Sequence, residues 1–148
     1  MSLDINIDRI KEAAKTAGKY YDHKTFNHVA RVVDYIIKNP TIPIYLQEDC
    51  VCLAYMHDLL EDTNYDPEDL PLYFRKALEK ISKPKNMNYD EYCKLIHDST
   101  DTDWGKCAWF VKLADMKDHL SQVDTLTPRL KEKYLSGLRY LKSEAKRS

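Results

Sequence analysis

Apolar residues recur at intervals of three and four along most of this chain, and that spacing places them on one face of an α-helix. Between Thr25 and Lys38 the recurring residues are Phe26, Val29, Val33, Ile36 and Ile37, and after Thr127 they are Leu130, Tyr134, Leu138 and Leu141. Glycine, a poor helix former, occurs only 3 times in 148 residues. The sequence therefore predicts an all-α protein whose helices bury apolar stripes against one another.

Capping residues and prolines divide the chain into separate helices. We expect helices over residues 7–19, 25–38, 45–60, 88–99 and 103–119, and a last helix that begins at Thr127-Pro128. Asp66-Pro67 is typical of a further helix start, and the segment from there to Ser82 is one helix or two, the second beginning at Pro71. Residues 1–148 are expected to form a single compact bundle of about seven to nine helices. Lys142 to Ser148 are expected to be a frayed basic tail.

The segment His57-Asp58-Leu59-Leu60-Glu61-Asp62-Thr63 is unusually rich in groups that bind or polarise a metal or a water. His28 lies upstream of it in Phe26-Asn27-His28-Val29-Ala30, and Asp115 lies downstream in Val111-Lys112-Leu113-Ala114-Asp115. Two imidazoles and two carboxylates make a mixed nitrogen and oxygen set that suits Mn²⁺, Fe²⁺, Co²⁺ or Zn²⁺. Four protein ligands leave positions open for water and substrate, and a divalent ion lowers the pKa of a bound water.

The acidic pair Glu61-Asp62 follows Asp58 at the spacing that shares one helix face. One interpretation is a solvated acidic helix end. However, acids at a helix C-terminus oppose the helix dipole and repel one another, and locally unfavourable choices tend to mark sites. We therefore expect Glu61 and Asp62 to be catalytic, since a carboxylate beside the metal can orient or deprotonate the attacking water.

These strings resemble those of a known protein family. His28, His57-Asp58 and Asp115 match the H…HD…D signature of the HD-domain metal-dependent phosphohydrolases. His57 to Thr63 is similar to the HDxxEDT string, and Val111 to Asp115 to the VKLAD string, of the ppGpp hydrolase domains of RelA/SpoT-type proteins and their small stand-alone relatives. The resemblance implies an HD-domain fold and one divalent metal, Mn²⁺ first, with the ligands His28, His57, Asp58 and Asp115. It implies a guanosine-3′,5′-bis(diphosphate) 3′-pyrophosphohydrolase.

The residues that read the nucleotide in that family are not matched here. The stretch before His28 has no Gly-x-Pro-Tyr segment, and His119 stands where the family usually has Asn. The alternatives are hydrolysis of another small phosphoester, such as a nucleoside monophosphate, or a weakly active nucleotide-binding regulatory module. Lys112, Lys83 and Arg31 are candidate phosphate contacts, although each also fits an ordinary surface charge.

The remaining composition narrows the class of protein. The net charge of −1 gives no general attraction to nucleic acid or membrane. There is no apolar run of 18 residues, and the first residues lack the apolar region of a signal peptide. The four cysteines form no CxxC pair, which favours reduced core thiols in a cytoplasmic protein. His23, His97 and His119 fit structural or exposed histidines, and Tyr134 fits a core residue.

Overall fold

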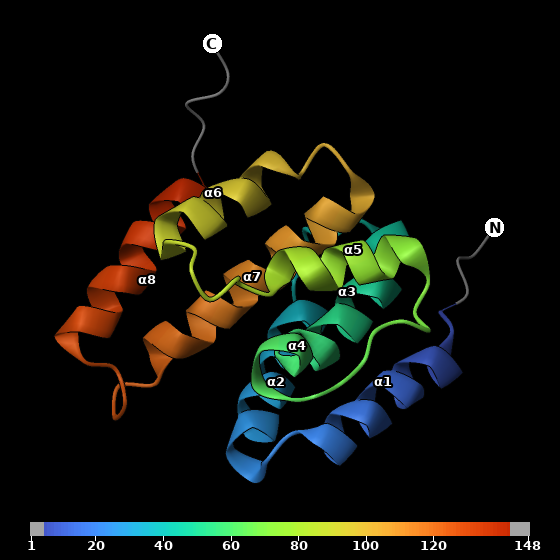
Figure 1. Cartoon of the computed structure of the whole chain (residues 1–148). Helices are drawn as coiled ribbons and strands as arrows, with labels where there is room; N and C mark the ends of the chain where they lie inside the picture. The colour runs from blue at the N-terminus through green and yellow to red at the C-terminus, as the bar shows by residue number, and fades with distance from the viewer. Residues whose placement is uncertain (1–4, 143–148) are drawn as a thin grey trace.

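The computed structural model describes residues 5–142, and every regular element within them is a helix, which confirms the all-α prediction. In chain order the helices are α1 (Ile7–Tyr20), α2 (His23–Ile37), α3 (Ile44–Met56), α4 (Leu59–Asp62), α5 (Leu72–Ile81), α6 (Tyr89–Asp98), α7 (Asp103–Ser121) and α8 (Pro128–Leu141). Figure 1 shows α1 and α2 at one end of the bundle and α6 and α8 at the other, with α7 running between them.

Side-chain caps explain where most of these helices begin. The side chains of Asn6, Asp22, Asn88, Thr102 and Thr127 each accept a hydrogen bond from a backbone N–H in the first turn of the helix that follows. Such bonds satisfy donors that have no partner inside the helix. Helices α3 and α5 instead follow Pro43 and Pro71 without a side-chain cap. The predicted starts at Asn88 and Thr127 agree with the structure.

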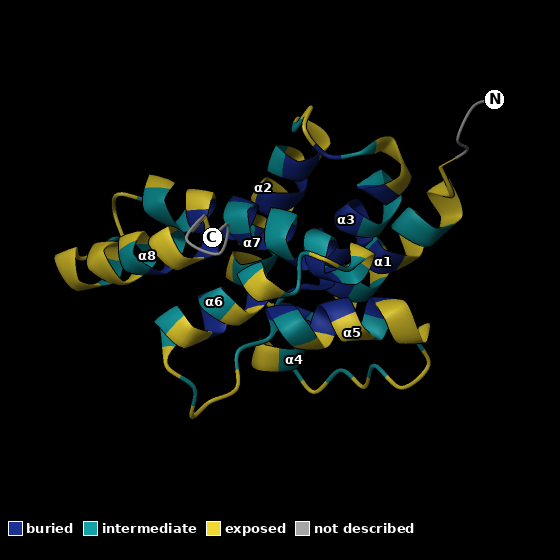
Figure 2. Cartoon of the chain, turned by 90° about the horizontal axis from the view of Figure 1, so that it is seen from above, coloured by how far each residue is buried: buried dark blue, intermediate teal, exposed yellow. Residues whose placement is uncertain are grey.

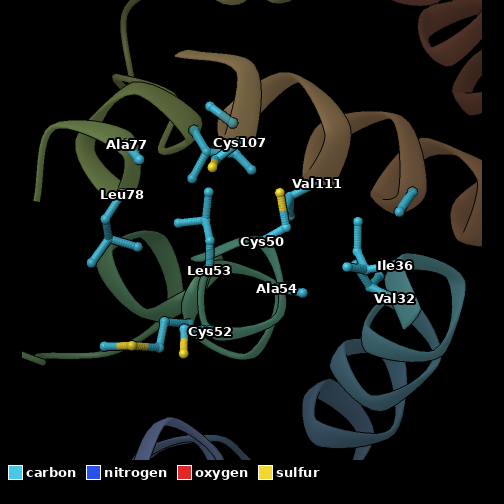
Figure 3. Close-up of a cluster of buried hydrophobic side chains, with 14 of the residues drawn as sticks. Val32, Ile36, Cys50, Cys52, Leu53, Ala54, Ala77, Leu78, Cys107 and Val111 are labelled. Atoms are coloured by element: carbon cyan, nitrogen blue, oxygen red, sulfur yellow. The ribbon is translucent and has the colours of Figure 1, made fainter. Parts of the chain in front are cut away.

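Helices α3 and α7 form the centre of the bundle. Helix α3 packs against α1, α2, α5 and α7, and α7 packs against α2, α3, α5, α6 and α8. Figure 2 shows these two helices mostly buried, while the outer helices carry exposed stripes. Figure 3 shows Cys50 and Leu53 of α3 facing Leu78 of α5 and Cys107 and Val111 of α7. One part of the apolar core therefore lies between α3, α5 and α7, and buried residues of α1, α2, α6 and α8 extend it.

The two central helices differ in what they bury. Every buried residue of α3 is apolar, whereas the buried residues of α7 include Lys112, Asp115 and Asp118. Burying a charge is costly unless it is paired and hydrogen-bonded. The charged face of α7 therefore indicates a polar site inside the bundle.

The helix expected over residues 45–60 is interrupted before its end. Helix α3 ends at Met56, Asp58 has φ −96° and ψ 0°, and the single turn α4 follows. The backbone N–H of Asp58 donates to the hydroxyl of Tyr21 at 3.1 Å. The N–H of Asp58 thus finds a partner outside the helix at the point where the helix ends. No local sequence signal predicts such a break.

The helix start predicted at Asp66-Pro67 is wrong. Asp66 accepts a hydrogen bond from the N–H of Glu68, and Leu70 donates to the carbonyl of Pro67, but these bonds close only a turn. Pro71 explains why the turn does not extend, because the residue before a proline is driven out of the helical region. The helix instead begins at Leu72, directly after Pro71, which agrees with the expected start of a second helix at Pro71.

All four cysteines are free and buried, as expected for core thiols. Within the described part of the chain, no helix has both the length and the apolar content needed to cross a membrane. The expected basic tail lies almost wholly outside the described residues, which end at Lys142.

Candidate metal centre

The break between α3 and α4 brings His57 and Asp58 to the same site. His57 lies at the C-terminal end of α3 and is only 3% exposed. On a continuous helix, consecutive side chains point about 100° apart. Here the chain turns at Asp58, and its Oδ1 lies 3.4 Å from His57 Nε2. The local distortion therefore places an imidazole and a carboxylate side by side.

Two further helices complete the group. His28 of α2 places its Nε2 2.9 Å from Oδ1 of Asp115, which lies in the middle of α7. His57 Nε2 lies 3.2 Å from the same oxygen, and His28 Nε2 lies 3.6 Å from Asp58 Oδ2. One donor atom from each of the four residues lies within 4.8 Å of the other three.

The spacing of these atoms suits ligands of a single ion. Donors bound at about 2.0–2.2 Å with bond angles near 90–109° stand roughly 3 Å apart. Four contacts between these side chains are 2.9 to 3.6 Å long, which is close to that value, and one donor atom from each residue lies within 4.8 Å of the others. The four residues singled out by the sequence thus form a group that could hold one divalent cation, and the nature of the ion is not determined by this geometry.

The outer nitrogen of each histidine has a hydrogen-bond partner that orients the ring. His57 Nδ1 lies 2.8 Å from the carbonyl oxygen of Ala54. That oxygen can only accept, so Nδ1 carries the proton and Nε2 faces the carboxylates. His28 Nδ1 lies 2.7 Å from Oδ2 of the fully buried Asp118, which places its Nε2 on the same centre. Partners of this kind are typical of metal-binding histidines.

Neighbouring charges within the protein shift the pKa values of two candidate ligands, Asp115 and His57, against the effect of burial. Burial would raise the pKa of Asp115, but the Lys112 ammonium and three imidazoles hold that pKa well below its usual range. Burial would likewise lower the pKa of His57, but Asp58 and Asp115 outweigh it and raise the pKa to about 9. Asp115 is therefore ionised and favours positive charge at this point.

Sequence reasoning missed two members of the site, Asp118 and His119. Asp118 joins His28 to Arg31, whose Nε donates to it at 2.8 Å. His119, interpreted as a structural or exposed histidine, places its Nε2 3.2 Å from Asp115 Oδ1. The available signal was their spacing, because positions three and four after Asp115 share its helix face.

His119 also connects the centre to α8. Its ring stacks on His28 with centroids 4.6 Å apart, and on Tyr134 with centroids 4.8 Å apart and planes 5° from parallel. Tyr134, expected in the core, is instead half-buried and lies at the edge of the site. The first half of α8 is thereby placed beside the candidate metal ligands.

The two expected catalytic acids lie one turn from Asp58 and are exposed. Partial burial and the neighbouring carboxylates Asp58 and Glu61 raise the pKa of Asp62. Glu61 accepts a hydrogen bond from the backbone N–H of Lys83, in the loop after α5. Glu61 is therefore tethered to that loop, whereas Asp62 lies within the electrostatic influence of Asp58.

The three expected phosphate contacts are each engaged within the protein. Lys112 is buried, and its Nζ lies 2.8 Å from Asp115 Oδ2. Arg31 pairs with Asp118, and the Nζ of Lys83 donates to the carbonyls of Pro84 and Met87. Lys112 is thus the closest of the three to the candidate centre.

No protein-family model matches this chain, and a search of curated proteins found no match either.

Proposed function

We propose that this chain is a metal-dependent phosphohydrolase of the HD type that acts on a phosphorylated nucleotide. The observation that carries the proposal is the group formed by His28, His57, Asp58 and Asp115, whose donor atoms lie within 4.8 Å of one another. The outer nitrogens of both histidines are already hydrogen-bonded, so their inner nitrogens are directed at one point. The resemblance of two sequence strings to the HD phosphohydrolases supports the same activity.

Mn²⁺ is the first candidate for the ion, with Fe²⁺, Co²⁺ and Zn²⁺ as alternatives, because the ligand set mixes imidazole and carboxylate. Such an ion would supply Lewis-acid activation of water and of the phosphoryl group. The four ligands would hold it, and Lys112 would keep Asp115 ionised through their ion pair. None of these roles requires a residue from outside the described part of the chain.

Of the two acids, Asp62 is the better candidate for accepting a proton from the attacking water. Partial burial and neighbouring carboxylates raise the pKa of Asp62, and a carboxylate with a raised pKa accepts a proton more readily. Glu61 is held by the N–H of Lys83, which suits a group that orients water or substrate. We therefore assign proton transfer to Asp62 and positioning to Glu61.

The proposed substrate is guanosine-3′,5′-bis(diphosphate), hydrolysed at the 3′-pyrophosphate, in a cytoplasmic protein. The alternative substrate is another small phosphoester such as a nucleoside monophosphate, because His119 occupies the place of the Asn usual in the resembling family. The sequence motifs support the chemistry of the centre more strongly than they support the identity of the base.

The proposal is tested first by metal binding and then by turnover. Wild-type protein is stripped of metal, titrated with Mn²⁺, and assayed for product against ppGpp, nucleoside mono-, di- and triphosphates and cyclic nucleotides. His57→Ala should abolish both binding and turnover. Asp62→Asn should retain the metal and lower kcat by roughly 10²–10⁴-fold, the span of a lost acid–base group. The exposed His23 offers a matched control, since His23→Ala removes an imidazole outside the site.

The outcomes separate the alternatives. Mn²⁺ binding without turnover of any substrate would contradict the enzyme and favour the alternative, a nucleotide-binding regulatory module. Equal metal binding by wild type and His57→Ala would contradict the proposed metal centre. Loss of metal in Asp62→Asn would show that Asp62 is a metal ligand and would contradict its assignment as the proton acceptor.

A further inference from the structure

Helix α8 presents a lysine beside the candidate centre that the sequence did not single out. The Nζ of Lys133 lies 4.6 Å from the ring centroid of Tyr89 and 5.6 Å from that of Tyr134. Tyr134 stacks on His119, which in turn contacts Asp115. Lys133 is therefore linked to the candidate metal ligands through two aromatic contacts.

The same tyrosine ring also receives the buried lysine of α7. Lys112 Nζ lies 5.3 Å from the Tyr89 centroid and 5.1 Å from that of Tyr92, while it pairs with Asp115 at 2.8 Å. An ammonium is attracted to the face of an aromatic ring, so tyrosines can hold two cations close together. Tyr89 thus bridges the cation at the centre and the cation at its rim.

Lys133 differs from Lys112 in its ion pairing. Across residues 5–142, no acidic oxygen lies within ion-pair distance of its Nζ, whereas Lys112 has Asp115. Burial and the positive charges of Lys112 and Lys83 lower the pKa of Lys133 by more than the carboxylate of Glu61 raises it. Positive charge therefore outweighs the carboxylate of Glu61 at this edge of the centre, and a bound anion would reduce the repulsion between the ammonium groups.

Space for such an anion is present in front of the lysine. Lys133 and Tyr89 line a hollow of about 420 Å³ between the first turn of α6 and the first half of α8. Arg129 adds a second cation to its wall, and the acids there are Glu132 and Asp90, the latter already accepting from Ser136 at 2.8 Å. The lysine therefore borders open space and is accessible to a ligand.

We propose that Lys133 binds a second phosphate group of the substrate, so that the site selects a diphosphate over a monophosphate. This inference rests on the proposed function, because it places the first phosphate at the metal centre beside Lys112. The second phosphate then lies over Tyr89, between the ammonium groups of α7 and α8. A substrate with one phosphate leaves Lys133 without a partner, and a substrate with two neutralises it.

The direct test compares inorganic pyrophosphate with inorganic orthophosphate as probes. Their dissociation constants are measured by calorimetry with free Mn²⁺ held constant, for wild type, Lys133→Met and Lys131→Met. Lys131 lies on the same helix and is exposed, so its replacement removes the same charge from another face. Circular dichroism confirms that each variant keeps the helical fold.

We expect Lys133→Met to weaken pyrophosphate binding roughly 10–100-fold, the range for a hydrogen bond to a charged group, and to leave orthophosphate within about twofold. Lys131→Met should change neither. In turnover, Lys133→Met should raise KM for diphosphates and leave KM for monophosphates unchanged.

Equal weakening of both probes, or of neither, would overturn the assignment, and so would an equal effect of Lys131→Met. Failure of the proposed function has a different signature, which is the absence of Mn²⁺ binding by wild type. In that case the comparison of the two probes is repeated in chelator, where a selective loss in Lys133→Met still supports the anion site and an equal loss overturns it.

Discussion

Asp118 is not one of the four candidate metal ligands, but it determines which ring nitrogen of His28 carries the proton. It is fully buried, accepts from Arg31 at 2.8 Å, and lies 2.7 Å from His28 Nδ1. Burial would raise its pKa, but hydrogen bonds from Arg31 and His28 hold the pKa below the usual value. Asp118 is therefore ionised and can only accept, which keeps the proton of His28 on Nδ1.

Replacing Asp118 with Asn should weaken metal binding without removing a ligand. The amide can donate to His28 Nδ1, which favours the proton on Nε2 and blocks the nitrogen that faces the centre. We expect the affinity for Mn²⁺ to fall about 10–100-fold, the usual effect of losing an orienting partner. Asp34→Asn, on the exposed face of α2, is the control and should have no effect. Unchanged affinity in Asp118→Asn would mean that packing alone orients His28.

The raised pKa of His57 predicts that metal affinity depends on pH. With the protein groups alone, burial lowers the pKa, but Asp58 and Asp115 outweigh it and raise it to about 9. A cation must displace that proton below pH 9, so apparent affinity should rise about tenfold for each pH unit gained per displaced proton. Titration between pH 6 and 8, in buffers of different ionisation enthalpy, measures the affinity and the released protons. Affinity that is flat over this range would contradict the prediction.

At the scale of single elements, α7 depends on a close approach at its first turn. Gly105 lies where a side chain would overlap the backbone carbonyl of Ser99. That carbonyl accepts from both the N–H and the hydroxyl of Thr102, the residue that caps α7, so it cannot move aside easily. Position 105 therefore requires the absence of a Cβ, although its backbone is helical.

Two glycine replacements should consequently have opposite effects. Gly105→Ala should destabilise the protein by about 1–3 kcal/mol or more, because the added methyl forces the backbone apart. Gly18→Ala, inside α1, places its methyl 3.9 Å from Phe26 and should stabilise by about 0.5–1 kcal/mol through lower backbone entropy in the unfolded chain. Urea unfolding of both variants measures the free energies. A destabilised Gly18→Ala would show that α1 tolerates no added volume.

At the scale of the whole molecule, the candidate centre joins α2, the α3–α4 junction and α7. His28 and Asp118 are separated by 90 residues in sequence, and His57 and Asp115 by 58. A cation bound at this point would therefore add a link between segments that are already held by apolar packing and by ion pairs such as Arg31–Asp118. Its binding energy should contribute to the stability of the folded chain, because the unfolded chain does not assemble the site.

Divalent cation should raise the thermal stability of the protein. At a free Mn²⁺ concentration 100 times Kd, the expected gain is about 2.7 kcal/mol. Differential scanning calorimetry with and without chelator measures the change in Tm, and His57→Ala should show no such change. A Tm that Mn²⁺ leaves unaltered in wild type would mean that the ion binds elsewhere or not at all.

The sequence alone determined the helical character of the chain and the identity of the residues that form the candidate centre. Helical spacing and capping signals are local, so they located most helices to within a few residues. The identities of His28, His57, Asp58 and Asp115 were also readable, because their residue types and family-like strings do not depend on distant contacts. Whether they bind a metal stays a prediction.

Only the tertiary structure decided how those residues meet. At the break, the N–H of Asp58 donates to the hydroxyl of Tyr21, 37 residues away, whereas local propensity favoured a continuous helix. Asp118 and His119 share the helix face of Asp115, which their spacing could indicate, but only the packing of α2 and α8 against α7 placed His28 and Tyr134 beside them. Lys133 gained its position in the same way, through the ring of Tyr89 on another helix. These features rest on contacts between segments far apart in the chain, and such contacts exist only once the helices have packed.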